Sequence, residues 1–375
     1  MNNQRKLPSG DDTRDPVSFV KPAVRAVSAY TLAARPARVK INQNENPFEL
    51  PEALKREVLE EALRRPWGRY PEFDPRELRE ALAEFVGFRP DGVLVGNGSN
   101  ELIEALLLVT VGPGTRVVIP EPTFTLYALL TGILGGEAVR VRLEASLRYD
   151  ASALVDAARR AGASLTIVCS PNNPTGSVLS LPEVERLCRE TEGLVVVDEA
   201  YHEFAGATVV PLLDRHPNLV VLRTFSKAMA LAGLRVGYLL AAPALVREID
   251  KARLPYNVNF FSEIAALLAL RRRDVLAAAV TRLRRLRDGV MAELGSMPGF
   301  VVHPSHANFF LLELLEADPK AVFEALYARG ILVRDVTSYP GLSRCLRISV
   351  GSEEENAALV DALQAVRPEA AAGRS

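Results

Sequence analysis

Three stretches with the same layout decide the fold: LTIVCSPNNPTG (165–176), LVVVDEAY (194–201) and LVVLRTFSK (219–227). Each begins with a short, mostly apolar run rich in β-branched residues and continues into polar residues. Runs that are apolar throughout, instead of alternating, are typical of strands covered on both faces in a mainly parallel sheet. Similar runs lie at 93–95, 116–119 and 236–240, with helical patterns between them. The region from 90 to 242 is therefore predicted to be an α/β domain.

The pattern changes after Pro255. A long helical stretch (262–294) precedes short strands near 300–302, 309–312, 331–333 and 346–349, with helices at 319–329 and 353–366. This alternation predicts a second, smaller α+β domain, which suits a chain of 375 residues. We divide the chain into an N-terminal arm and segment that packs on the small domain (1–45), a large ligand-binding domain (46–260) and a small C-terminal domain (261–375).

Composition excludes several classes of protein. The formal net charge is −1, from 45 basic and 46 acidic residues, so nothing in the bulk charge favours binding to nucleic acid or to anionic membranes. No apolar stretch approaches the roughly 20 residues that span a bilayer. The polar N-terminus lacks a secretory signal, and the three cysteines are widely spaced. We expect a cytoplasmic protein with reduced cysteines and no metal site.

Polar residues follow the predicted strands where ligands bind in such sheets. Gly96-Asn97-Gly98-Ser99-Asn100 leads into a helix whose N-terminal amides suit a phosphate, although a tight turn with a helix cap fits equally well. Asp198 ends one strand, and Lys227 follows another, with Arg235 eight residues later. A lone aspartate is often a cap, and most lysines are solvated. Together, however, these loops supply what pyridoxal phosphate requires.

Six phrases carry a family resemblance: NENP (44–47), GNGSNELI (96–103), SPNNPTG (170–176), VVDEAYHEF (196–204), SKAMALAGLRVGY (226–238) and CLRISVG (345–351). In these the chain resembles the fold-type I pyridoxal-phosphate aminotransferases of the aspartate aminotransferase superfamily, and most of all the histidinol-phosphate aminotransferases. The resemblance covers about residues 28 to 366. It implies an α/β fold-type I transferase whose large domain binds pyridoxal 5'-phosphate.

The resemblance also implies roles for the residues that match family motifs. Lys227 binds the cofactor's aldehyde and then moves a proton, while Asp198 pairs with the pyridine nitrogen. Asn173 and Tyr201 hydrogen-bond the 3′ oxygen of the ring. Phe124 stacks on the ring. The remaining cofactor contacts are to the phosphate, and they come from Gly98, Ser99, Asn100, Thr224, Ser226, Arg235 and, across a homodimer, the neighbouring subunit's copy of Tyr70.

The implied substrate contacts include two arginines. Arg347 resembles the superfamily's carboxylate-binding arginine, and Arg334 matches a second arginine of the histidinol-phosphate branch. Such a pair suits histidinol phosphate, which has a phosphate where amino acids have the α-carboxylate. Alternatively, Arg334 forms a surface ion pair and Tyr70 is a packed aromatic. The other family pocket positions are Tyr30, Asn46, Tyr256 and Asn257.

The implied reaction is transamination of histidinol phosphate with 2-oxoglutarate, giving imidazole-acetol phosphate and glutamate in histidine biosynthesis. An aromatic or other amino-acid aminotransferase, or a phosphothreonine decarboxylase, is the alternative from the same superfamily. A non-catalytic sensor module and a nicotinamide-dependent dehydrogenase fit less well, because the first lacks a DNA-binding extension and the second its glycine fingerprint. Two departures from the family concern the pocket: Phe48-Glu49 after NENP, and phenylalanine at 124 where many relatives have tyrosine.

Overall fold

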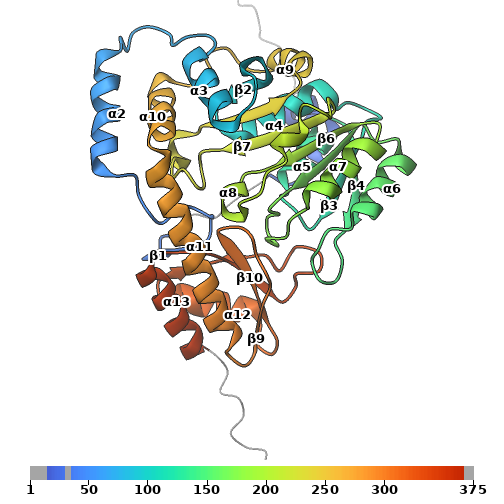
Figure 1. Cartoon of the computed structure of the whole chain (residues 1–375). Coiled ribbons are helices and arrows are strands. Elements are labelled where there is room, and N and C mark those ends of the chain that lie inside the picture. Colours follow the sequence, from blue (N-terminus) through green and yellow to red (C-terminus); the bar gives the residue numbers. More distant parts are fainter. Residues whose placement is uncertain (1–14, 30–34, 367–375) are drawn as a thin grey trace, which may run out of the picture.

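A seven-stranded sheet forms the centre of the computed structural model, which describes residues 15–29 and 35–366 (Figure 1). Its strand order is β2-β8-β7-β6-β5-β3-β4. The only antiparallel member is β8, since every other neighbouring pair in this sheet is parallel. The strands are β2 (Val93–Gly96), β3 (Arg116–Glu121), β4 (Glu137–Arg142), β5 (Leu165–Cys169), β6 (Leu194–Asp198), β7 (Leu219–Thr224) and β8 (Gly237–Ala241).

Helices cover both faces of this sheet. Alternate strand residues enter two different hydrophobic clusters: Val196 belongs to one, and Val195 and Val197 belong to the other. This explains why the strands are apolar throughout. Among the described residues, no helix is both long and apolar enough to cross a bilayer. The helices of this part are α2 (Glu52–Arg64), α3 (Arg76–Val86), α4 (Ser99–Thr110), α5 (Leu126–Ile133), α6 (Ala151–Ala161), α7 (Leu181–Glu190), α8 (His202–Ala205) and α9 (Pro243–Asp250).

The C-terminal part is built on a four-stranded antiparallel sheet with the order β12-β13-β10-β9. Figure 1 shows α11 running from the large sheet's helices down to this smaller sheet. Phe309 and Leu346 of the small sheet belong to the same hydrophobic cluster as Val196, so the two sheets share one core. The elements are α10 (Phe260–Arg271), α11 (Arg273–Gly295), β9 (Phe300–Val302), β10 (Phe309–Leu314), α12 (Pro319–Ala328), β12 (Arg334–Asp335), β13 (Cys345–Ser349) and α13 (Glu353–Val366).

The N-terminal segment reaches this C-terminal part. After a short 3-10 turn (Pro16–Phe19) and α1 (Pro22–Arg25), β1 (Val39–Lys40) pairs in parallel with β11 (Ile331–Leu332). Asn42, Gln43 and Asn44 then line the cofactor cavity described below, and Glu45 lines a second hollow beside it. The N-terminal segment therefore brings residues to the junction of the sheets.

Helix ends follow local sequence signals. The side chain of Asp150 caps α6 by accepting from the amide of Ala153, and Gly162 ends that helix in the left-handed conformation. Ser180 and Glu183 form a capping box at the start of α7. These signals fix where the helices beside β5 and β6 begin and end.

Besides the two-residue strands β1 and β12, which the sequence did not predict, two elements differ from the sequence expectation. The predicted 262–294 helix is two helices, because Arg272 leaves the helical conformation with φ −110° and ψ 31°. Strand β4 was not expected, because its sequence EAVRVR is half polar and its position at the sheet edge leaves it partly exposed. Neither change affects the order of the strands that carry the polar loops.

Candidate active site

The polar residues predicted at the strand ends meet in one cavity of about 290 Å³. The parallel pairing of β5, β6 and β7 brings their carboxyl ends together, with Cys169 opposite Asp198 and Asp198 opposite Leu222. Of the predicted site residues, those that line the cavity are Ser99, Asn100, Phe124, Asn173, Asp198, Tyr201, Thr224, Ser226, Lys227, Arg235, Arg334 and Arg347.

Asp198 is the buried acid of this cavity, with 3% of its surface exposed. Its Oδ1 accepts from the amide of Ala200 at 3.0 Å, and its Oδ2 accepts from the hydroxyl of Tyr127 at 2.6 Å. Burial raises the pKa of Asp198, while the Tyr127 and Ala200 hydrogen bonds oppose that rise. A cationic partner in the cavity would favour the charged carboxylate.

Lys227 reaches the cavity from the loop after β7, and its Nζ donates to the carbonyl oxygen of Gln43 at 2.9 Å. Burial of the amine lowers the pKa of Lys227 to about 8, and the cationic side chain of Arg347 adds to this shift. A lysine with this pKa is partly neutral near physiological pH. Its amine is therefore able to act as a nucleophile or a base.

A cradle suited to a phosphate lies at the N-terminus of α4. Gly98 precedes this helix with φ +76°, and no side chain caps the first turn. The Arg235 guanidinium closes the cradle and donates to Ser226 Oγ at 3.1 Å, and Thr224 Oγ1 donates to the same oxygen at 3.0 Å. Helix-end amides, hydroxyls and a guanidinium together favour a dianion.

The backbone at this cradle tolerates only glycine at two positions. A Cβ on Gly98 would lie 2.3 Å from Arg235 Nη2, and a Cβ on Gly237 would lie 2.4 Å from the Ser99 amide nitrogen. Arg235 itself has φ +54°, an uncommon conformation for a residue with a side chain. The donor set, the buried acid and the lysine thus fit pyridoxal phosphate, which combines a phosphate, a basic ring nitrogen and an aldehyde.

Two arginines face the same cavity from adjacent strands. Arg334 on β12 and Arg347 on β13 are directly opposite each other in the antiparallel register. Arg347 donates to Asn173 Oδ1 and to the carbonyl oxygen of Asn42, both at 2.6 Å, and its guanidinium lies over the Phe309 ring. Two cationic side chains from paired positions in the wall of one cavity favour an anionic ligand there.

Aromatic and amide side chains complete the walls. The hydroxyl of Tyr201 accepts from Asn44 Nδ2 at 3.1 Å, and burial raises the pKa of Tyr201, so the phenol is protonated. Phe124 meets the Tyr127 ring edge to face at 5.5 Å. Asn173, expected near the cofactor's 3′ oxygen, lies beside Arg347 in the cavity wall.

The other predicted site residues lie outside this cavity. Tyr70 is 80% exposed and stacks on Tyr256 with ring centroids 4.5 Å apart. Asn257 donates to Glu101 Oε2 at 2.7 Å, beside the phosphate cradle. Gly98 adjoins the cavity at the start of α4. Tyr30 lies outside the described residues.

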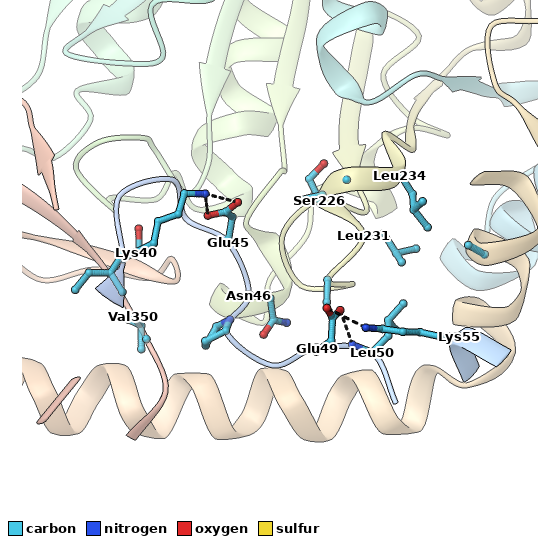
Figure 2. Close-up of a pocket in the computed structure, with 18 of the residues that line it drawn as sticks. Lys40, Glu45, Asn46, Glu49, Leu50, Lys55, Ser226, Leu231, Leu234 and Val350 are labelled. Atoms are coloured by element: carbon cyan, nitrogen blue, oxygen red, sulfur yellow. Dashed lines mark hydrogen bonds and ion pairs between the residues drawn. The ribbon is translucent and has the colours of Figure 1, made fainter. Parts of the chain in front are cut away.

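Asn46 belongs to a second hollow of about 690 Å³ between β1, α2 and the 230–234 loop (Figure 2). Its amide donates to the carbonyl oxygen of Ala228, and Ser226 lines both hollows. The ion pairs Lys40–Glu45 at 2.7 Å and Lys55–Glu49 at 3.0 Å appear in Figure 2 at its sides. From the second hollow, outside the cofactor cavity, Asn46 therefore contacts the loop that carries Lys227.

The first departure from the family pattern is explained by local contacts. The Phe48 ring packs under the guanidinium of Arg282, 4.2 Å from the ring centroid, and Glu49 pairs with Lys55. Glu49 thus lines the second hollow, Phe48 packs beside α11, and neither residue lines the cofactor cavity.

One group among the described residues could hold a metal ion: His303, Glu313 and Cys345, whose ligand atoms lie within 4.8 Å of one another. His303 Nε2 is 3.0 Å from Glu313 Oε2. Burial raises the pKa of Cys345 to about 12, so the thiol is protonated in the free protein. The expected absence of a metal site stays a prediction.

Sequence reasoning missed several residues of the cavity. Tyr127 and Tyr339 line it, as do Asn42 and Gln43 just before the NENP phrase. Phe124 precedes α5 (Leu126–Ile133), so no helical periodicity links it to Tyr127, which resembles an ordinary aromatic residue of a core helix. No sequence pattern pointed to Tyr339, which reaches the cavity from an irregular loop.

Comparison with known proteins agrees with this geometry. A sequence profile of the family described as "Aminotransferase class I and II" matches residues 37–363. The chain is 40% identical to the histidinol-phosphate aminotransferase of Chlorobium phaeovibrioides, over 94% of this chain and 98% of that relative. It is 39% identical to that of Chlorobaculum tepidum, over 92% and 99% of the two chains.

A crystal structure of histidinol-phosphate aminotransferase from Sinorhizobium meliloti in complex with pyridoxal-5'-phosphate superposes with a TM-score of 0.82 at 27% identity, covering 92% of this chain and 96% of that one. The L-threonine-O-3-phosphate decarboxylase of Porphyromonas gingivalis shares the fold, with a TM-score of 0.77 at 24% identity, covering 87% of this chain and 98% of that one. The chain belongs to the class I and II aminotransferases and, within that family, to the histidinol-phosphate aminotransferases.

Proposed function

We propose that this protein transfers the amino group of histidinol phosphate to 2-oxoglutarate, giving imidazole-acetol phosphate and glutamate, with pyridoxal 5'-phosphate as its cofactor. The observation that carries the proposal is a single cavity that contains a lysine of lowered pKa, a buried aspartate and two arginines on adjacent strands. The lysine and the aspartate suit the aldehyde and the ring nitrogen of pyridoxal phosphate, and the two arginines suit an anionic substrate.

The cofactor would be held by residues from three strand ends. Its phosphate would be bound by the first turn of α4 together with Thr224, Ser226 and Arg235, and its ring nitrogen would pair with Asp198. When bound, pyridoxal phosphate supplies an aldehyde that combines with amines and a ring that accepts electron density from the substrate's Cα. Because the Asp198 carboxylate is buried, its charge stabilises a proton on the ring nitrogen more than a solvated carboxylate would.

Lys227 first anchors the cofactor and later moves a proton. Its amine is partly neutral near pH 8, since burial and Arg347 disfavour the ammonium form. The Lys227 amine would hold the cofactor through its aldehyde and, when free, would act as the base that accepts the proton of the substrate's Cα and donates it again. Gln43, whose carbonyl oxygen accepts from Nζ, gives the free amine a defined position.

Arg347 and Arg334 recognise the anionic group of each substrate. A guanidinium binds a phosphate or a carboxylate with the same pair of donors, so one pocket accepts histidinol phosphate and then 2-oxoglutarate. The neighbouring Asn173 and the Asn42 carbonyl hold Arg347 in place before a substrate arrives. Preorganisation of this kind lowers the entropic cost of binding.

We further propose a cytoplasmic homodimer in which Tyr70 reaches the partner's phosphate site. The support is an exposed aromatic cluster in which Tyr70 and Phe73 both contact Tyr256. Such a patch is typical of an interface. Light scattering of the purified protein tests the dimer, and a monomer at micromolar concentration would contradict it.

For the domains, we retain the division into 1–45, 46–260 and 261–375. Limited proteolysis tests it. Cleavage near residues 45 and 260 is expected before cleavage within either sheet, and early cleavage inside the sheets would contradict this division.

Spectral half-reactions test the function. Histidinol phosphate and glutamate should each remove the visible absorption of the bound cofactor, and 2-oxoglutarate should restore it. A chain that reacts with phenylalanine but not with histidinol phosphate would be an aromatic aminotransferase. Release of carbon dioxide from phosphothreonine would point to the decarboxylase alternative.

A further inference from the structure

Tyr127 is a buried phenol that directly contacts the acid of the cavity. It lies on α5 and is fully buried, and its hydroxyl donates to Asp198 Oδ2 at 2.6 Å. Burial and the adjacent carboxylate raise the pKa of Tyr127 well above its usual range, so the phenol keeps its proton and acts as a donor. The bond is charge-assisted when Asp198 is ionised.

The arrangement fixes both oxygens of Asp198. Oδ1 accepts from the Ala200 amide, and Oδ2 accepts from Tyr127. The Phe124 ring meets Tyr127 edge to face, which limits rotation of the phenol. The carboxylate can therefore point in only one direction, and its remaining lone pairs serve the cavity.

A donor to Asp198 decides where a shared proton resides. A buried carboxylate without donors is a stronger base than one in water, and it draws a proton from its partner. A hydrogen bond from Tyr127 stabilises the charged carboxylate and weakens that tendency. The proton then remains on the basic nitrogen opposite Asp198.

We propose that Tyr127 is a positioning residue that keeps Asp198 charged and oriented, so that the proton between Asp198 and the cofactor's ring stays on the ring nitrogen. This inference rests on the proposed function, because it assumes that pyridoxal phosphate occupies the cavity. It assigns Tyr127 a role in the rate of the reaction and none in the choice of substrate.

The test compares Tyr127→Phe with the wild-type holoenzyme. The variant removes one oxygen atom, and we expect kcat to fall by about tenfold to a hundredfold, the usual effect of losing a hydrogen bond to a charged group. The KM for histidinol phosphate should stay within about threefold, since the two arginines are unchanged. With cofactor labelled by ¹⁵N at the ring, the nitrogen's NMR shift should move toward the value of the unprotonated ring.

Tyr149→Phe is the matched control. Tyr149 is also a buried tyrosine, but its hydroxyl donates to the carbonyl oxygen of Cys169 and not to Asp198. We expect this variant to lose stability without moving the ¹⁵N shift. A double-mutant cycle separates the remaining cases: in an Asp198→Asn background, Tyr127→Phe should have almost no further effect on kcat.

The outcomes are distinct. A wild-type protein that binds no pyridoxal phosphate would refute the proposed function. A wild-type protein that reacts, beside a Tyr127→Phe variant with unchanged kcat and ¹⁵N shift, would refute only the role of Tyr127. Equal effects in the Asp198 and Asp198→Asn backgrounds would show a purely structural role. If the phenylalanine variant does not fold, a fluorinated tyrosine at 127 keeps the hydrogen bond, and its stronger donor should shift the proton further onto the ring.

Discussion

Gly98→Ala should weaken cofactor binding by moving Arg235. The added Cβ would lie 2.3 Å from Arg235 Nη2, whereas non-bonded carbon and nitrogen atoms need about 3.4 Å. The guanidinium is the flexible end of its side chain, so it shifts by about 1 Å and leaves its place beside Ser226. The alanine also inherits φ +76° and ψ 165°, a conformation that is almost confined to glycine.

These two costs affect different quantities. The backbone strain, about 1 to 3 kcal/mol, lowers the free energy of unfolding with or without cofactor. The displaced arginine weakens a charge-assisted contact to the phosphate worth about 1.5 to 3 kcal/mol, which corresponds to a dissociation constant for pyridoxal phosphate about 10 to 100 times higher.

Absorbance titration of the apoprotein measures that dissociation constant. Two alanine variants serve as controls: Gly114→Ala has the positive φ (+85°) without any atom near its Cβ, and Gly112→Ala has neither feature. Both should bind the cofactor as the wild type does, although Gly114→Ala should be less stable. Unchanged cofactor affinity in Gly98→Ala would refute the close approach of Arg235 to the cradle.

Three further outcomes are expected. The pKa of Lys227 is lowered from 10.5 to about 8, so the neutral amine appears as the pH rises through 8. The rate at which the apoprotein takes up the cofactor should therefore rise between about pH 7 and 9 and then level off. A rate that increases steadily up to pH 10.5 would contradict the lowered pKa. In steady-state kinetics, Arg347→Ala and Arg334→Ala should each raise the KM for histidinol phosphate by about 10 to 100 times. Arg329→Ala, at an exposed position, should leave this KM unchanged. Equal KM values for all three variants would argue against an anion site formed by Arg334 and Arg347. Glu199→Gln leaves the buried Arg223 charge without its partner at 2.8 Å and should lower the free energy of unfolding, measured with urea, by about 3 to 5 kcal/mol. Glu185→Gln, in a more exposed pair with Arg215, should lower it by less than about 1 kcal/mol.

The sequence alone predicted most strands of the large sheet and the site residues at their ends. The mostly apolar runs predicted the six strands that carry or flank the site, because a strand covered on both faces has no polar side that alternates with an apolar one. Once parallel strands were expected, Asp198 and Lys227 had to meet at the same sheet edge. β4 was missed for the opposite reason, since an edge strand with exposed Arg140 and Arg142 has little need of apolar residues.

Residues that reach the site from distant parts of the chain were harder to find. Gln43, which meets Lys227, follows β1, and a strand of two residues leaves almost no sequence pattern. Tyr127 looked like an ordinary aromatic residue of a core helix, and its hydrogen bond to Asp198 depends on how α5 packs on the sheet. A local sequence pattern predicts periodicity and turns, whereas the contacts of Gln43 with Lys227 and of Tyr127 with Asp198 depend on tertiary packing.

Borohydride reduction of the holoenzyme, followed by peptide mass spectrometry, tests the central claim most directly. A covalent link between the cofactor and Lys227 predicts a single reduced pyridoxyl group on the peptide that contains residue 227, and none after Lys227→Ala. A pyridoxyl group on Lys40 or another lysine, or no adduct at all, would contradict the assignment of this cavity.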